Sequence, residues 1–148
     1  MPKTETSTMT IADRLRPVLL RVGRELRREA RDEGVSPEQV ALLVHVKYHP
    51  GIGIGELAER ERVSPPAVSN RVDRLEQEGL LARTPSADDR RRVGLTLTAE
   101  GERVLRRVRS RRTAWLVLRL QQLSPAELAA VDAAVEPLAL LLDEEERP

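Results

Sequence analysis

The sequence predicts a mainly α-helical protein with one small β-hairpin, an α+β fold. Over most of the 148 residues, apolar side chains recur every three or four positions, which is the spacing of one helix face. Serine followed by proline, a strong helix-start signal, occurs at Ser36, Ser64 and Ser124. Residues 93–97 instead alternate large apolar with small residues, as a β-strand does.

The chain is expected to begin with a disordered segment followed by one long helix. Residues 1–9 are small and polar, which favours disorder. A helical stripe then continues until Gly34, where glycine ends the helix. Pro17 lies inside this pattern and predicts a kink or a late helix start. The stripe consists of Ile11, Leu15, Val18, Leu19, Val22 and Leu26.

Three shorter helices are expected in the centre of the chain. The first begins at Ser36 with a capping box and stops at residues 49–51, which read His-Pro-Gly. A short helix is expected around residues 56–61. The third, from residue 65 to about residue 78, is capped by Ser64.

A hairpin should follow these helices. Residues 80–84 and 93–97 are expected to form strands, and residues 85–92 a charged turn between them. Helix, turn, helix and hairpin in this order form a winged helix-turn-helix, in which the second helix and the hairpin, or wing, read DNA.

The last part of the chain is expected to be helical again. Thr98 caps a helix that is basic at first, with six arginines between Arg103 and Arg112, and apolar later. A further helix starts at Ser124, contains Pro137 and has apolar residues in a heptad rhythm, which suits packing against partner helices. The heptad residues are Leu128, Val131, Val135, Leu138 and Leu142.

These elements predict one compact organisation, because no linker is long enough to separate independent domains. The predicted parts are a disordered N-terminus (1–9), a helical dimerisation region (10–35 and 99–143), a winged helix-turn-helix DNA-binding region (36–98) and an acidic tail (144–148).

Composition excludes several kinds of site. The chain has 25 basic and 24 acidic residues, so DNA binding must follow from the placement of charge and not from its total. The absence of cysteine excludes thiol sensing and zinc–thiolate sites. The sequence shows no membrane-spanning run and no signal pattern, so we expect a cytoplasmic protein. One Trp and one Tyr are too few for a base-stacking platform.

The helix at residues 65–78 is the predicted DNA-reading helix. Base edges are read by a polar face near a helix N-terminus, and Asn70 can pair with adenine while Arg71 reaches guanine or phosphate. The alternative, an ordinary amphipathic helix with a solvated face, is about as well supported by this helix alone. The candidate contact residues are Ser64, Pro65, Pro66, Ala67, Ser69, Asn70, Arg71 and Arg74.

The hairpin tip, residues 88–92, reads Asp-Asp-Arg-Arg-Arg and strengthens the DNA-binding interpretation. Arginine inserted into a narrow minor groove reads DNA shape, and a neighbouring aspartate can hold it in place. The alternative is a charged hairpin that resists edge-to-edge aggregation.

The stretch from residue 54 to residue 83, followed by DDRRRVGLTLTAEG, resembles the multiple antibiotic resistance regulator (MarR) family. The resemblance covers roughly residues 11–142 and implies an obligate dimer on a pseudo-palindromic operator. It implies that Arg91 is the minor-groove finger, oriented by Asp89, and that Arg90 and Arg92 contact phosphate. The adjacent prolines at positions 65 and 66 depart from the usual pattern.

The family often binds aromatic acids or phenols, and the resemblance implies a cleft lined by His45, Tyr48, Trp115 and an arginine. The alternative is that Tyr48 and Trp115 are core residues. His45 and His49 have metal-ligand spacing, but helix-end histidines are the simpler interpretation, and no metal or cofactor is expected.

The sequence therefore predicts a dimeric, sequence-specific DNA-binding regulator, most simply a repressor relieved by a small aromatic or phenolic ligand. With two histidines, no cysteine and no phosphate-binding glycine loop, an enzyme is not expected. The alternative is a winged-helix architectural or protein-interaction module without operator specificity.

Overall fold

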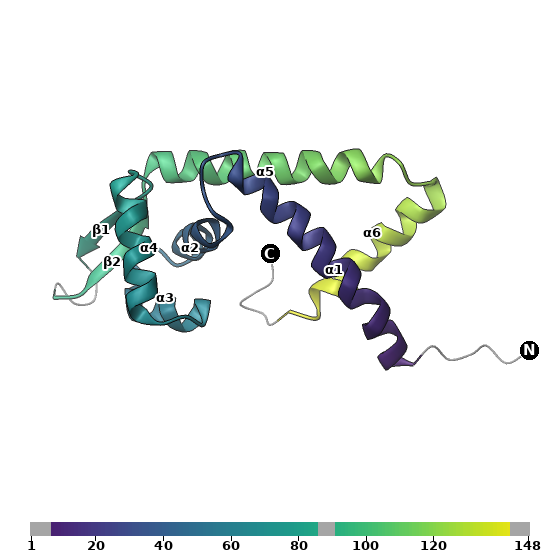
Figure 1. Ribbon diagram of the computed structural model, residues 1–148, viewed down its shortest axis with the longest axis horizontal. Coiled ribbons are helices and arrows are strands. Elements are labelled where there is room, and N and C mark those ends of the chain that lie inside the picture. The colour runs from purple at the N-terminus through teal and green to yellow at the C-terminus, as the bar shows by residue number, and fades with distance from the viewer. Residues whose placement is uncertain (1–6, 86–90, 143–148) are drawn as a thin grey trace, which may run out of the picture. The chain divides into compact units, whose positions relative to one another are not determined.

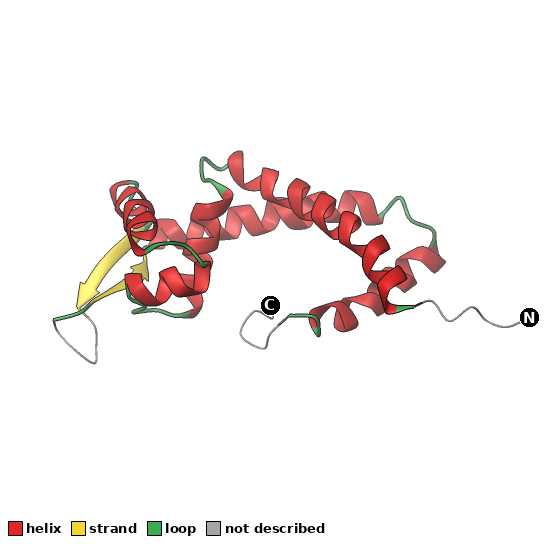
Figure 2. Ribbon diagram, turned by 60° about the horizontal axis from the view of Figure 1, so that its bottom comes forward, coloured by secondary structure: helices red, strands yellow, loops and turns green. Residues whose placement is uncertain are grey.

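The computed structural model describes residues 7–85 and 91–142, and they form helices and one hairpin (Figure 1). Secondary structure follows the expected order (Figure 2). The elements are α1 (Thr8–Arg31), α2 (Pro37–Tyr48), α3 (Ile54–Glu61), α4 (Pro65–Gln77), β1 (Leu81–Pro85), β2 (Val93–Leu97), α5 (Ala99–Leu120) and α6 (Pro125–Ala139).

Helix starts follow the capping signals at two of the three Ser-Pro sites. The Ser36 hydroxyl accepts from the Gln39 N–H at 3.1 Å, and the Gln39 side chain accepts from the Ser36 N–H at 2.8 Å. Ser124 and Glu127 form the same capping box before α6. α1 begins at Thr8, so the expectation of disorder was wrong for residues 8 and 9, where the Ser7 hydroxyl caps the first turn. Residues 1–6 lie outside the described part.

Ser64 differs from the other two serines. It stands at the N-cap of α4, but its hydroxyl accepts no capping hydrogen bond. Pro65 and Pro66 occupy the first two helical positions and have no N–H to donate. The expected side-chain cap is therefore absent, and prolines that are already helical in φ start the helix instead.

The hairpin is antiparallel, with Leu81 opposite Leu97 and Pro85 opposite Val93. The first strand is thus one residue later than expected, and Pro85 belongs to it. The Gly51 N–H donates to the Leu95 carbonyl at 2.8 Å, and the Leu95 N–H donates to the Ile52 carbonyl at 2.9 Å. The loop before α3 is thereby joined to the hairpin.

The described residues belong to two compact units, Met1–Arg112 and Thr113–Pro148. The first unit has a continuous apolar core to which α2, α3, α4 and the hairpin all contribute. Its fully buried large side chains are Leu42, Leu43, Val46, Leu57, Val68, Val72, Leu75, Leu95 and Val108. This core fixes α4 and the hairpin on one scaffold.

The second unit contains the end of α5 and all of α6. α6 has no buried residue. Its heptad residues Leu128, Val131 and Val135 are 43%, 44% and 56% exposed. Within the described part, no helix is long and apolar enough to cross a membrane.

Candidate nucleic-acid interface

α4 buries one face and leaves the opposite face to solvent. Val68, Val72 and Leu75 are fully buried, and their spacing of four and three residues orients the helix. Asn70 and Arg74 are exposed on the remaining surface, as are Pro65 and Pro66. The helix is held by its apolar face, so its polar face can approach a ligand without disturbing the core.

The polar groups of this face are largely unoccupied. Within the described part of the chain, neither the Asn70 side chain nor the Arg74 guanidinium makes a hydrogen bond or an ion pair, and the Ser64 hydroxyl makes no capping bond. Arg71, Arg74 and Asn70 line one side of a hollow of about 360 Å³, and the start of α2 lines the other with Ser36, Glu38 and Gln39.

Glu38 sets the electrostatics of this hollow. Its own backbone N–H and the Ser36 hydroxyl donate to its carboxylate, and the positive charges of Arg71 and Arg31 add to their effect. Together they hold the pKa of Glu38 below its usual value. Glu38 therefore stays ionised near α4 and offsets part of the positive charge there.

The predicted wing residues are only partly within the described structure. Asp89 and Arg90 lie outside the described residues, so the expected Asp89–Arg91 pair stays a prediction. Arg91 and Arg92 are exposed and immediately precede β2. The hairpin register therefore places two of the three predicted arginines at the far end of the wing from Leu81 and Leu97.

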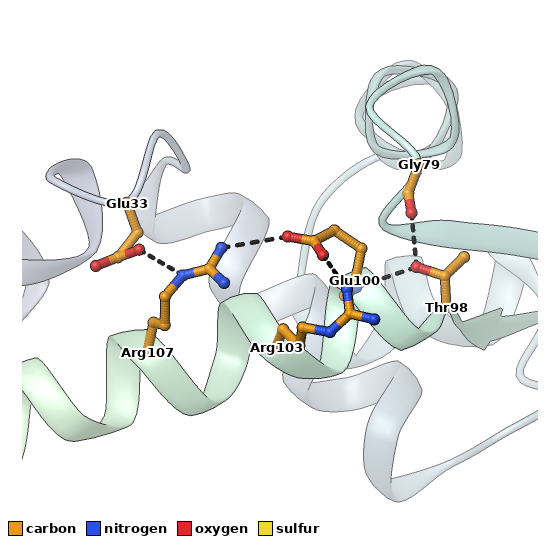
Figure 3. A network of polar contacts seen from close by, with 7 residues as sticks. Glu33, Gly79, Thr98, Glu100, Arg103 and Arg107 are labelled. Carbon is orange, nitrogen blue, oxygen red and sulfur yellow. Dashed lines mark hydrogen bonds and ion pairs between the residues drawn. The ribbon is translucent and has the colours of Figure 1, made fainter.

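A polar network joins the end of α4 to the start of α5 (Figure 3). The Thr98 hydroxyl donates to the Gly79 carbonyl at 2.6 Å and accepts from the Gly101 N–H at 3.0 Å. Gly101 permits this approach, because a Cβ there would lie 2.2 Å from the Leu80 carbonyl oxygen. The predicted helix cap at Thr98 is confirmed, and it also fixes the chain at the end of α4.

Acids neutralise much of the basic start of α5. Arg103 pairs with Glu100 at 2.6 Å, and Arg107 pairs with Glu100 at 3.3 Å and Glu33 at 2.8 Å (Figure 3). Hydrogen bonds from Arg103 and Arg107 hold the pKa of Glu100 below its usual value. Arg111 similarly pairs with Asp32. Arg107 and Arg111 connect α5 to the end of α1, and none of the three arginines is a free cationic surface.

Sequence reasoning missed the connection between α4 and the wing. Arg83 on β1 pairs with Asp73 and with Glu76, both on α4. Two sequence features could have predicted these ion pairs. Asp73 and Glu76 are three residues apart and so lie on one helix face, and Arg83 occupies a strand position whose side chain points outward.

The residues expected to bind a small ligand lie in different settings. His45 Nε2 is 2.9 Å from Glu61 Oε1, joining α2 to α3. Tyr48 is 69% exposed, so its alternative role as a core residue was wrong. In the second unit, the Arg119 guanidinium stacks on the partly buried Trp115 ring at 4.5 Å.

The described residues include no group of three or more metal-ligating side chains that could hold a metal.

A helix-turn-helix with an open polar face, followed by a two-stranded wing, defines a winged helix-turn-helix DNA-binding protein. The MarR family model matches residues 35–93. The transcriptional repressor MdtR of Bacillus subtilis is 32% identical over 90% of this chain and 86% of its own length. The chain belongs to the MarR family of transcriptional regulators.

Solved structures agree with this assignment. The YusO protein of Bacillus subtilis superposes with a TM-score of 0.73 at 30% identity, covering 95% of this chain and all of its own. S. aureus MepR, in a mutant form bound to an oligodeoxyribonucleotide, has a TM-score of 0.68 at 22% identity over 90% of this chain and 99% of its own. The second likeness concerns the fold alone.

Proposed function

We propose that this DNA-binding regulator is a dimeric repressor that recognises a pseudo-palindromic operator and is released by a small aromatic or phenolic ligand. The observation that carries the proposal is the exposed polar face of α4. On this face the side chains of Asn70 and Arg74 make no hydrogen bond or ion pair with the described residues. Polar groups that are exposed and already oriented can bind base edges and phosphates with little loss of internal bonding. The repressor name of MdtR supports the same role.

In this proposal α4 enters the major groove. Asn70 pairs with adenine, and Arg71 and Arg74 contact guanine or phosphate. The free Ser64 hydroxyl and the short residues around Ser69 allow the helix to approach closely. Arg91 enters the minor groove with Asp89 as its orienting partner, and Arg90 and Arg92 contact phosphate.

The dimer follows from apolar surface that the chain leaves uncovered. Val18, Leu19 and Leu20 on α1 are 55%, 46% and 59% exposed, and α6 buries none of its residues. Exposed apolar residues gathered on a helix often mark a surface that binds another protein. A second copy that covers these helices would hold the two copies of α4 and its wing about 34 Å apart, which is one helical turn of DNA.

The ligand part of the proposal rests on family resemblance and on Tyr48 and Trp115. Tyr48 is largely exposed and Trp115 partly exposed, so each ring has free surface on which an aromatic compound can pack. His45 is half-buried, and its Nε2 is already bonded to Glu61, so a ligand would reach it through the other ring nitrogen or by breaking that bond.

Gel shifts at several salt concentrations test the DNA-binding proposal. The probes are a duplex selected by the protein from a random library and a random duplex of equal length. A repressor should prefer the selected duplex by about a thousandfold or more. Equal affinity for both would indicate an architectural protein, and no binding at low salt would indicate a protein-interaction module.

A further inference from the structure

Arg83 connects the wing to α4, and the proposed function assigns this arginine no role. Its guanidinium Nη2 pairs with Asp73 Oδ1, and its Nε lies 3.5 Å from Glu76 Oε2. Arg83 belongs to β1, whereas both acids belong to α4 and lie three residues apart on one helix face. One side chain thus ties the wing to the reading helix through two carboxylates, and we call this group the α4–wing brace.

The brace is too exposed to be explained by stability. The side chains of Arg83, Asp73 and Glu76 are 34%, 53% and 44% exposed. Exposed ion pairs contribute about 0–1 kcal/mol, because water screens them and ordering the side chains costs entropy. The buried core already packs α4 against the hairpin through Leu75, Leu81 and Leu95.

The same acids carry a cost for DNA binding. Asp73 and Glu76 place two negative charges on the helix that must approach a polyanion, and a carboxylate near phosphate weakens sequence-independent attraction. These ion pairs therefore add little to folding stability and weaken general affinity for DNA. Their remaining role is to hold α4 and the wing in a fixed relative position.

We propose that Asp73 and Glu76, acting through Arg83, are positioning residues that set the angle between α4 and the wing. With this angle fixed, a wing can meet the minor groove while α4 lies in the neighbouring major groove. The inference rests on the proposed operator binding. The planar guanidinium presents Nε and Nη2 along one edge, so one side chain can contact both carboxylates at once, which a lysine ammonium cannot do with the same geometry.

A loosened brace should affect specificity more than affinity. Sequence-independent binding depends on the number of charges near phosphate and tolerates small changes of angle. Base and groove contacts need both elements in place together. The relevant quantity is therefore the ratio of affinities for a selected duplex and a random duplex.

The test measures both affinities for Asp73→Asn, Arg83→Gln, the double variant and Arg83→Lys. For Asp73→Asn, affinity for the random duplex should stay constant or rise because an acid is lost, while the affinity ratio falls about tenfold. Arg83→Lys should lower the ratio at constant net charge. The double variant should be no worse than either single variant, because each removes the same connection.

Glu56→Gln is the matched control. Glu56 is 55% exposed and pairs at 3.3 Å with Arg60 of its own helix, so its loss removes one acid without disconnecting two elements. This variant should change both affinities together and leave the ratio constant. Thermal unfolding of every variant shows that each is folded at the assay temperature.

The proposed role of the α4–wing brace would be wrong if the ratio of affinities for the selected and random duplexes were unchanged in Asp73→Asn or in Arg83→Lys. Either result would leave the proposed operator binding intact. Failure of the wild-type chain to select any duplex would instead overturn the proposed function, and the brace with it.

Discussion

Arg62 is the only residue other than glycine with positive φ in the described parts of the chain, at 54°. It ends α3 in the left-handed conformation, where the backbone N–H bonds the carbonyls of Ala58 and Glu59. For an L-residue with a Cβ this conformation costs roughly 1 kcal/mol, and glycine avoids that cost.

Arg62→Gly should therefore raise the free energy of unfolding by up to about 1 kcal/mol, measured by urea denaturation. Glu59→Gly is the control, because it places glycine inside α3 and should lower stability by about 1 kcal/mol. If both variants lost stability equally, the left-handed turn at position 62 would not be the cause.

Gly101→Ala tests the close approach between α5 and the end of α4. Its Cβ would lie 2.2 Å from the Leu80 carbonyl oxygen, so the backbone must shift, and we expect a loss of about 1–3 kcal/mol in unfolding experiments. Gly55→Ala, where nothing lies within 4 Å of the added Cβ, should be neutral or stabilising. Equal effects at the two sites would contradict this packing.

Among the elements, the capped starts of α2 and α6 lower the pKa of an acid in their first turn. Glu127 accepts hydrogen bonds from the backbone N–H and the hydroxyl of Ser124, and they hold its pKa below the usual value of 4.5. Because the folded-state pKa is the lower one, this stabilisation is complete above pH 4.5 and is lost as pH falls through the folded-state pKa.

Ser124→Ala should accordingly move the pKa of Glu127 upward, toward 4.5, in a carboxyl chemical-shift titration. The pKa of Glu38 should not move, since its shift depends on Ser36 at another helix. A Glu127 midpoint that ignores the substitution would show that the Ser124 hydroxyl does not lower this pKa and that the Ser124 backbone N–H, which alanine keeps, is sufficient.

The reading helix gives a prediction about base preference. Asn70→Ala removes the amide that can bond adenine, and it should relax the preference at one base pair in each half-site, at a cost of about 1–3 kcal/mol. Selection of duplexes from a random library measures this preference. Gln77→Ala, also exposed on α4 but at its last residue, is the control and should select the same sequence as the wild type.

For the molecule as a whole, we propose that the uncovered apolar surface of α6 packs against a second copy of the chain. Leu138→Asp puts a charge into the heptad surface, and burying that charge in an interface costs several kcal/mol. We expect monomers in sedimentation-velocity experiments at micromolar concentration. Gln122→Asp adds the same charge in the exposed turn before α6 and should leave the dimer intact. A stable dimer of the Leu138 variant would exclude α6 as the interface.

Local sequence signals were enough to specify which elements form and in what order. Capping serines, prolines at helix starts and apolar periodicity act within a few residues, so α2, α4, β2 and the start of α5 were all foreseen. The same local patterns, with the resemblance to a known family, were enough to identify a winged helix-turn-helix regulator.

The three-dimensional structure was needed to tell which arginines are already held in ion pairs and which can still bind another molecule. Arg83, Arg107 and Arg111 look like Arg71 and Arg74 in the sequence, but each of the first three is paired with an acid from another part of the chain. The physical reason is that ion pairing depends on distances between elements, and the packing of α4 against the hairpin and α5 sets those distances. No local pattern contains that information.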